Sequence, residues 1–374
     1  MSRGVSRIEA RLSSKIAEGE YYEAHQMIRT LASRYRTSKK HQDALQLITK
    51  GILELYELKQ SGSASDLGLL YCSILDDVEK LTETNHEQIG KIHKSTIECL
   101  EFEQPEREQF ERRILKRTGE ICENPMGHPK TRLAFAQNYV QASDKARSAK
   151  NMEDFTVTIT LARQHFQYSE NGREIAKFLA QLTEYSSRNM SEVELICTQM
   201  TLQLLHQHTV PVANEFLQAF SRFHPQLESR FPSNYPLLNY CFFLLKTIDS
   251  KDVKAFKFLN FAYQPFLAEP DPTLMEYIIR IGEIYFGIVE KKSRPQGGLM
   301  DIIGSLMGGR PLSSDSDDDD DSAGPPAGLD MGALMNMAND MFSGMMNQPQ
   351  SQSSKSAPPK PAAPPADEDV DDLD

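Results

Sequence analysis

The chain has 374 residues, of which 39% are hydrophobic and 25% charged, and its formal net charge at pH 7 is −12. Residues 311–374 account for that charge with 14 acidic and 2 basic residues, and the neutral remainder does not favour a nucleic-acid-binding body. Five widely spaced cysteines, no run of about 18 apolar residues and no apolar leader after Met1 favour a cytosolic protein without a disulfide framework and without membrane insertion.

Three helices are predicted at the N-terminal end, over residues 2–17, 19–35 and 39–58, because their apolar residues recur at three- and four-residue steps. In the second of these helices, the face predicted to be buried holds Tyr22, Ala24, Met27, Ile28 and Leu31. Three tyrosines of this segment are expected to pack against neighbouring helices: Tyr21, Tyr22 and Tyr35. Because one short helix cannot bury such a stripe alone, the pattern predicts a stack of helical hairpins.

Capping chemistry predicts where further helices begin. The spacing of a capping box is met by Thr84 with Glu87, by Ser191 with Glu194, and in a similar form by Asn171 with Glu174. Four prolines stand where a first helical turn tolerates them: Pro105, Pro129, Pro211 and Pro272. Residues 155–161 alternate like a strand, but their flanks predict a capped helix. Residues 224–236 contain three prolines, which leaves two alternatives, a short hairpin or an ordered loop.

The predicted fold class is all-α. About fourteen helices would stack as antiparallel hairpins in a tetratricopeptide-like α-solenoid with a pitch of about 35–40 residues. Residues 1–150 and 151–292 are its N-terminal and C-terminal halves. The composition changes at Ser293, and residues 293–374 are predicted to be a disordered tail that is acidic and rich in methionine and proline.

The sequence contains no catalytic or cofactor-binding pattern. It has no GxxxxGK[ST] phosphate loop, no GxGxxG after a strand and no HExxH. His206 and His208 are two residues apart on a predicted helix, so they point about 200° apart and cannot hold one metal. Cys122 and His128 lack two further ligands of zinc spacing. The sequence therefore predicts no enzyme, no cofactor and no metal site.

Two surfaces remain as candidate sites. Basic residues follow one another at four-residue steps on the first helix: Arg3, Arg7, Arg11 and Lys15. This basic stripe is either a solvated face or a dock for an acidic partner. Residues 235–245 are apolar on nearly every side of a helix, which indicates either core or a surface that a partner covers. The candidate contacts there are Tyr235, Leu237, Leu238, Phe242 and Phe243.

Two segments of the tail are amphipathic. One apolar stripe follows helical spacing at Leu299, Ile302, Ile303, Leu306 and Met307. The second consists of Leu334, Met337, Met341 and Met345. Either these segments have incidental helical spacing, or they fold back on the solenoid or touch apolar clients.

Eight segments of the sequence, taken in order, carry a resemblance. They are RIEARL at 7–12, GEYYEAHQMIRTLASRY at 19–35, SASDLGLL at 63–70, GHP at 127–129, YPLLNY at 235–240, YQPFL at 263–267, DPTLMEYIIRIGEIYFG at 271–287 and GGLMDIIGSLMGG at 297–309. Together they resemble the Golgi to ER traffic protein 4 family over about 300 of the 374 residues. Beyond residue 310 the long acidic, methionine-rich extension departs from that family's compact tails.

The resemblance implies a non-catalytic cytosolic adaptor in the delivery of tail-anchored membrane proteins to the endoplasmic reticulum. It implies that the N-terminal half, 1–150, binds the dimeric targeting ATPase. It also implies that the C-terminal half, 151–292, holds a ubiquitin-like-domain protein and a BAG-domain scaffold. On this chain the ATPase would meet the basic stripe, with Tyr21 and Tyr22 assigned to structure. The C-terminal partner would meet residues 224–236 and the aromatic contacts of 235–245.

One alternative function stays open. The chain could be a helical-repeat co-chaperone or a multisubunit-complex scaffold unrelated to tail-anchored targeting. Such scaffolds usually finish in a winged-helix domain with strands, and residues 250–374 show no strand pattern.

Overall fold

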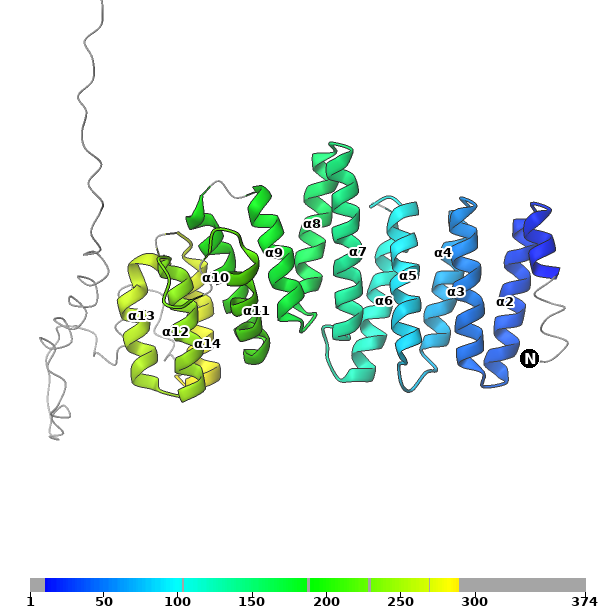
Figure 1. Cartoon of the computed structure of the whole chain (residues 1–374). Helices are drawn as coiled ribbons and strands as arrows, with labels where there is room; N and C mark the ends of the chain where they lie inside the picture. Colours follow the sequence, from blue (N-terminus) through cyan, green and yellow to red (C-terminus); the bar gives the residue numbers. More distant parts are fainter. Residues whose placement is uncertain (1–10, 103, 187–188, 228–229, 269, 289–374) are drawn as a thin grey trace, which may run out of the picture. The chain divides into compact units, whose positions relative to one another are not determined.

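The computed structural model describes residues 11–288 apart from 103, 187–188, 228–229 and 269. These residues fold into helices joined by turns and short links, without a strand, and all of them belong to one compact unit, residues 1–311 (Figure 1). The predicted all-α fold is confirmed for this part of the chain. The tail predicted to be disordered, 293–374, lies outside the described residues.

Thirteen complete helices, α2 to α14, follow a helical segment at 11–17 within the described residues. Their bounds are α2 (Tyr21–Thr37), α3 (His41–Glu57), α4 (Ser61–Leu75), α5 (Glu83–Cys99), α6 (Pro105–Cys122), α7 (Pro129–Ser148), α8 (Met152–Gln167), α9 (Gly172–Ser186), α10 (Met190–His206), α11 (Val210–Phe223), α12 (Pro236–Ser250), α13 (Val253–Ala268) and α14 (Thr273–Phe286).

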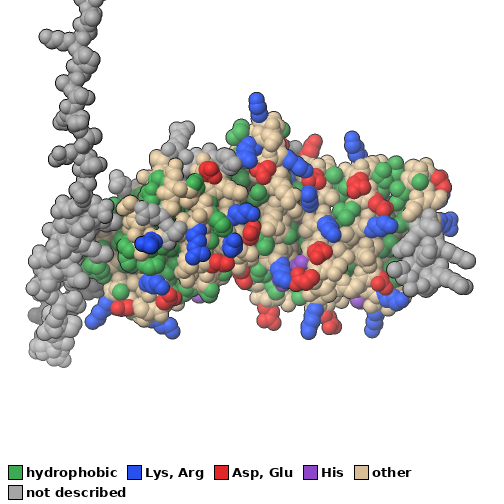
Figure 2. Space-filling view, viewed as in Figure 1, with side chains coloured by type: hydrophobic (Ala, Val, Ile, Leu, Met, Phe, Trp, Pro, Cys, Tyr) green, Lys and Arg blue, Asp and Glu red, His purple; other side chains and the backbone are tan. Residues whose placement is uncertain are grey.

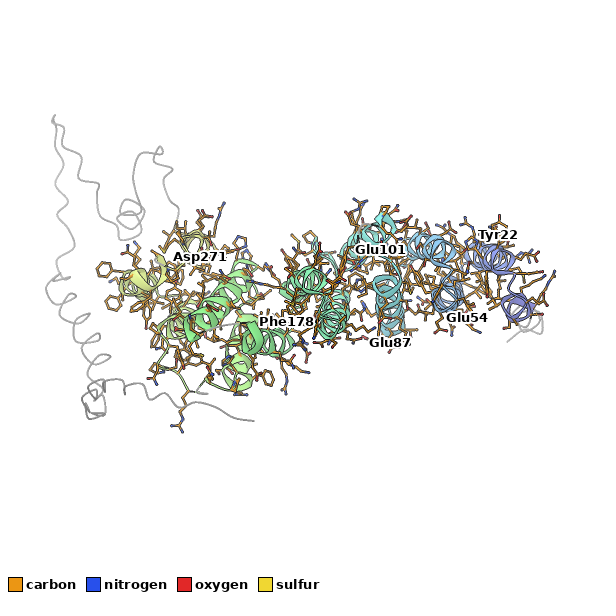
Figure 3. The ribbon with its side chains drawn as sticks, turned by 90° about the horizontal axis from the view of Figure 1, so that it is seen from above. Tyr22, Glu54, Glu87, Glu101, Phe178 and Asp271 are labelled. Atoms are coloured by element: carbon orange, nitrogen blue, oxygen red, sulfur yellow. The ribbon has the colours of Figure 1, made fainter. Side chains whose placement is uncertain are left out.

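The helices pack in a regular order. In the first half, α3 contacts α2 and α4, α5 packs on α3, α6 on α4, α7 on α5, and α8 on α7 (Figures 1 and 3). In the second half, α11 packs on α9, and α10 contacts α11, α12 and α14. Hydrogen bonds between successive hairpins join residues 36 to 48 positions apart, for example Arg163 to Gln199 and Asn138 to Gly90. The pitch therefore varies along the stack, partly within the predicted 35–40 residues and partly above them.

The apolar core consists of two clusters that adjoin within α7. The first cluster runs from Leu12 to Phe135, and the second from Ala136 to Ile281. Each hairpin therefore buries its apolar stripe against its neighbours along the stack, as solenoid repeats do. The division into functional halves at residue 150 stays a prediction.

Two predicted helix starts are wrong by two residues. α5 is capped by Thr82, which forms a capping box with Asn85, in place of Thr84 with Glu87. The side chain of Asn189 caps α10 by accepting a hydrogen bond from the backbone N–H of Glu192, in place of the predicted Ser191 with Glu194.

Other predicted helix starts are confirmed. Asn171 accepts a hydrogen bond from the backbone N–H of Glu174 at 3.0 Å. Three of the prolines lie in a first helical turn, whereas Pro272 is the residue just before α14. Residues 155–161 are helical within α8, as their flanks predicted, and Asn151 caps this helix.

Candidate functional site

Only part of the predicted basic stripe lies in the described chain. Arg3 and Arg7 are outside the described residues, whereas Arg11 is exposed. Lys15 forms ion pairs with Glu23 at 3.0 Å and Glu18 at 3.6 Å, and it also contacts Glu20. Hydrogen bonds to Glu20 and Glu23 raise the pKa of Lys15. Its charge is therefore matched within the chain, and Arg11 is the cation of the described stripe that a partner reaches most directly.

Tyr22 is exposed, which corrects its predicted place on the buried face of α2. Its exposed fraction is 72% (labelled in Figure 3), whereas Ala24 and Ile28 are fully buried. The reason is geometric: two residues along a helix rotate a side chain by about 200°, so Tyr22 points away from the core-facing side of Ala24. Tyr21 and Tyr35 are partly buried and pack against the first cluster, as predicted.

Two carboxylates fix α2 against α4 and the residues just after it. The carboxylate of Asp66 in α4 lies 2.7 Å from Nε2 of His25 and also pairs with the guanidinium of Arg29, and both partners belong to α2. Arg36 donates to Asp77, just after α4, at 2.5 Å. Part of the positive charge in the first forty residues therefore serves the fold, which leaves fewer cations for a partner.

The aromatic segment 235–245 divides between core and surface. Leu237 and Leu238 are 5% and 1% exposed and belong to the second cluster, so a partner cannot reach them on the folded protein. Tyr235, Phe242 and Phe243 are only partly buried. Of the predicted contacts, these three aromatic rings are the ones that reach the surface.

Residues 224–236 form turns and bends in their described part, so no hairpin strand is found there. The side chain of Asn239 accepts a hydrogen bond from the backbone N–H of Ser233 at 2.6 Å and donates one to its carbonyl oxygen at 2.8 Å. The carboxylate of Glu194 accepts a hydrogen bond from the N–H of Leu237 at 2.8 Å, and burial raises the pKa of this carboxyl. These bonds order the loop as it enters α12.

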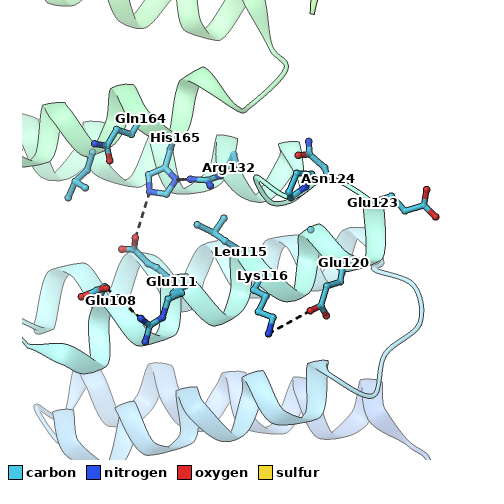
Figure 4. Close-up of a pocket in the computed structure, with 14 residues that line it drawn as sticks. Glu108, Glu111, Leu115, Lys116, Glu120, Glu123, Asn124, Arg132, Gln164 and His165 are labelled. Atoms are coloured by element: carbon cyan, nitrogen blue, oxygen red, sulfur yellow. Dashed lines mark hydrogen bonds and ion pairs between the residues drawn. The ribbon is translucent and has the colours of Figure 1, made fainter. Parts of the chain in front are cut away.

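A largely buried carboxylate, that of Glu111 in α6, has a side chain only 14% exposed and faces His165 of α8 (Figure 4). His93 of α5 approaches one carboxylate oxygen at 3.0 Å, and His165 of α8 approaches the other at 3.7 Å. The hydroxyl of Tyr139 in α7 donates to the same oxygen as His93. We call Glu111, His93, Tyr139 and His165 the carboxylate cluster. It links α5, α6, α7 and α8 across the junction of the two core clusters.

The neighbours of the two histidines determine which ring nitrogen carries the proton. The Asn138 amide donates to Nδ1 of His93 at 3.1 Å, and the Arg132 guanidinium donates to Nδ1 of His165 at 3.1 Å. Because amide and guanidinium N–H groups only donate, both rings carry their proton on Nε2 and direct it at Glu111. Neutral imidazoles therefore suffice to satisfy the carboxylate.

The electrostatics of the carboxylate cluster indicate a structural clamp. Burial alone would raise the pKa of Glu111, but the bonds from His165 and His93 outweigh burial and hold this pKa well below its usual range. A carboxylate that stays charged, accepts hydrogen bonds from His93 and Tyr139 and has His165 close by is poorly suited to accept a proton in catalysis. It also borders a groove of about 710 Å³ between α6 and α8.

Sequence reasoning missed the carboxylate cluster. The signal in the sequence was weak: His93 and His165 stand among apolar residues of their helices, as Ile89 and Ile92 show for the first of them. A histidine on an apolar face needs a buried partner, but the sequence does not say which carboxylate on another helix supplies it.

Stability is expected to fall as the pH is lowered from about 6.5 towards 4. Burial and the charge of His128 lower the pKa of His86 to about 4, and burial also lowers the pKa of His165. Below about pH 6.5 these two histidines therefore bind protons in the unfolded chain that they do not bind in the folded chain. The midpoint of urea unfolding, followed by circular dichroism, should decrease over this range.

The substitution His86→Gln should make that pH profile shallower, because glutamine does not titrate. The same substitution at His206, which is exposed on α10, is the matched control. A His86→Gln profile that overlays the wild type would contradict the assignment of His86.

Metal sites and membrane spans were also sought in the described part of the chain. It holds no group of three or more His, Cys, Asp or Glu side chains arranged to bind a metal ion. None of its helices is both long and apolar enough to cross a membrane.

Comparisons of the sequence with a protein-family model and with individual relatives agree with each other. The family model described as Golgi to ER traffic protein 4 matches residues 38–307. The Golgi to ER traffic protein 4 homolog of Xenopus tropicalis is 34% identical over 315 residues, covering 82% of this chain and 88% of the relative. The homolog of Homo sapiens is 32% identical over 330 residues, covering 87% and 94%.

The crystal structure of C. therm. Get4 shares the fold. It aligns with a TM-score of 0.61 at 20% sequence identity and covers 84% of this chain and 100% of that one. The resemblance carried by the eight sequence segments thus agrees with a family match over most of the helical stack, with relatives above 30% identity and with the helical architecture. The chain belongs to the Golgi to ER traffic protein 4 family.

Proposed function

We propose that this protein is a non-catalytic adaptor in the delivery of tail-anchored membrane proteins to the endoplasmic reticulum. It would act in the cytosol and bridge the targeting ATPase to a ubiquitin-like and BAG-domain chaperone complex. The observation that carries this proposal is family membership across the helical stack, from residue 38 to residue 307. A stack of helices offers extended surfaces for partners on both halves, which suits a bridge.

The N-terminal half, 1–150, is proposed to bind the dimeric targeting ATPase. Arg3, Arg7 and Arg11 remain the proposed contacts, and Lys15 contributes less because glutamates match its charge. Tyr22 is added to this surface, since its ring is 72% exposed. Tyrosine and arginine are the residue types that most often dominate the binding energy of an interface.

The C-terminal half, 151–292, is proposed to hold the ubiquitin-like-domain protein and the BAG-domain scaffold. Tyr235, Phe242 and Phe243 are the proposed contacts, because they are the aromatic residues of the segment that stay partly exposed. Phe242 stacks on Phe231 with ring centres 5.0 Å apart, so the two rings present a firm apolar surface.

Reversing the charge of Arg7 and Arg11 to glutamate is expected to weaken ATPase binding by about tenfold or more at low salt and by less at high salt. The reason is that opposite charges steer association and are screened by ions. Isothermal titration calorimetry with the targeting ATPase at two salt concentrations measures this. The pair Lys91→Glu and Lys94→Glu, two exposed lysines of α5, is the matched control with the same change in charge.

Binding of the C-terminal partners should be unchanged in the Arg7 and Arg11 variant. If ATPase affinity is also unchanged at both salt concentrations, the basic stripe is a solvated face and this site is wrong. Affinity purification of the full chain with identification of its partners tests the adaptor function itself. Recovery of an unrelated multisubunit complex without the ATPase would favour the alternative scaffold function.

A further inference from the structure

The outward face of α13 carries an apolar stripe that is exposed at Phe261 and Pro265 and partly exposed at Phe258. The inward face holds buried residues such as Phe256 and Tyr263. Phe258, Phe261 and Pro265 follow at i, i+3 and i+7, and at 100° per residue they point about 180° away from the buried face. Phe261 is 42% exposed. Figure 2 shows apolar side chains gathered over α12 and α13.

The chain turns back towards α13 where its described part ends. Gly287 follows α14 with a φ of +64°, and the N–H of Ile288 donates to the carbonyl of Gly282 at 3.1 Å. A Cβ placed on Gly282 would lie 3.3 Å from Phe256 of α13 and 3.7 Å from Ile288. Ile288, Gly282 and Phe256 therefore meet at one point, so the chain leaves α14 beside α13.

The sequence that follows can reach the stripe. Ten residues, 289–298, connect Ile288 to Leu299 and can span at most about 33–36 Å. The 16 residues of α13 extend over only about 24 Å. Leu299 begins an apolar stripe of helical spacing that ends at Met307, and glycine pairs bound this segment on both sides. Its nine residues match the length of the stripe on α13, which extends over the eight residues 258–265.

We propose that residues 299–307 dock through their apolar stripe on Phe258, Phe261 and Pro265 of α13. Two apolar helical faces that cannot be buried alone would cover each other. A tether of ten residues gives an effective concentration on the order of millimolar, which favours this segment over a second copy of the chain as the occupant. The proposal does not depend on the proposed function.

Amide hydrogen exchange of the full chain, read by mass spectrometry, tests the docking. Residues 299–307 should exchange at least about tenfold more slowly than the second methionine stripe of the tail, 334–345. The double substitution Ile303→Asp with Leu306→Asp should abolish that protection and speed exchange in α13. Phe261→Asp, at an exposed position, should release residues 299–307 in the same way.

Two matched controls separate docking from general effects of the substitutions. Met337→Asp with Met341→Asp changes the tail equally, and Met152→Asp changes a side chain that is 62% exposed on α8. Both should leave the protection of 299–307 intact. The proposal is overturned if 299–307 exchanges as fast as 334–345, or if Phe261→Asp leaves its protection unchanged. Protection that increases with protein concentration would also overturn it, because a second copy would then cover the stripe.

Discussion

Replacing Glu111 by glutamine is expected to lower the free energy of unfolding by about 3 kcal/mol. The carboxylate is charged, accepts hydrogen bonds from the buried side chains of His93 and Tyr139, and has Nε2 of His165 at 3.7 Å. Glutamine has nearly the same shape, but its NH₂ group turns a donor towards those N–H and O–H groups. Buried donors without an acceptor are costly. Urea unfolding at neutral pH, followed by circular dichroism, measures the loss.

Glu108→Gln is the matched control for that substitution. Glu108 lies on the same helix and borders the same groove, but its side chain is 80% exposed. Its replacement should change stability by no more than about 0.5 kcal/mol. If the two substitutions lower the free energy of unfolding equally, stability depends on the total charge of α6, and the carboxylate cluster does not act as a structural clamp.

Features that depend on neighbours in sequence could be predicted. The apolar periodicity predicted an all-helical stack, and the first-turn prolines together with the Asn171 cap predicted several helix starts correctly. The cap of α5 shows the limit of such reasoning. Thr82 and Thr84 both offer a hydroxyl, but Asn85 also exchanges hydrogen bonds with Gln42 of α3. A contact between helices therefore supports the earlier start.

Features that depend on packing between helices could not be predicted. His93, Glu111 and His165 lie on three helices, and only the folded stack brings their side chains together. In the same way, the sequence could not separate the buried Leu237 and Leu238 from the partly exposed rings beside them. That distinction requires knowing which neighbouring helices cover each face of α12.

Replacing Phe135 by alanine is expected to lower the free energy of unfolding by about 4 kcal/mol. Phe135 is fully buried in α7, stacks on His93 with ring centres 3.8 Å apart, and meets His165 edge-on at 5.5 Å. Its loss leaves a cavity and removes the apolar wall that holds both rings towards Glu111. Urea unfolding should show the loss, whereas Phe223→Ala, at a side chain 39% exposed, should cost about 1 kcal/mol or less.

The helices in which amide exchange becomes faster after Phe135→Ala show whether Phe135 stabilises only its neighbouring helices or the whole core. Helices of a solenoid contact mainly their neighbours, so a defect at Phe135 should speed amide exchange in α5 to α8 more than in α12 to α14. Equal acceleration at both ends would mean that the two core clusters open as one cooperative unit. Faster exchange confined to the middle helices would mean that α7 is where the two clusters separate. We expect the second outcome, because Phe135 belongs to the first cluster while its neighbour Ala136 already belongs to the second.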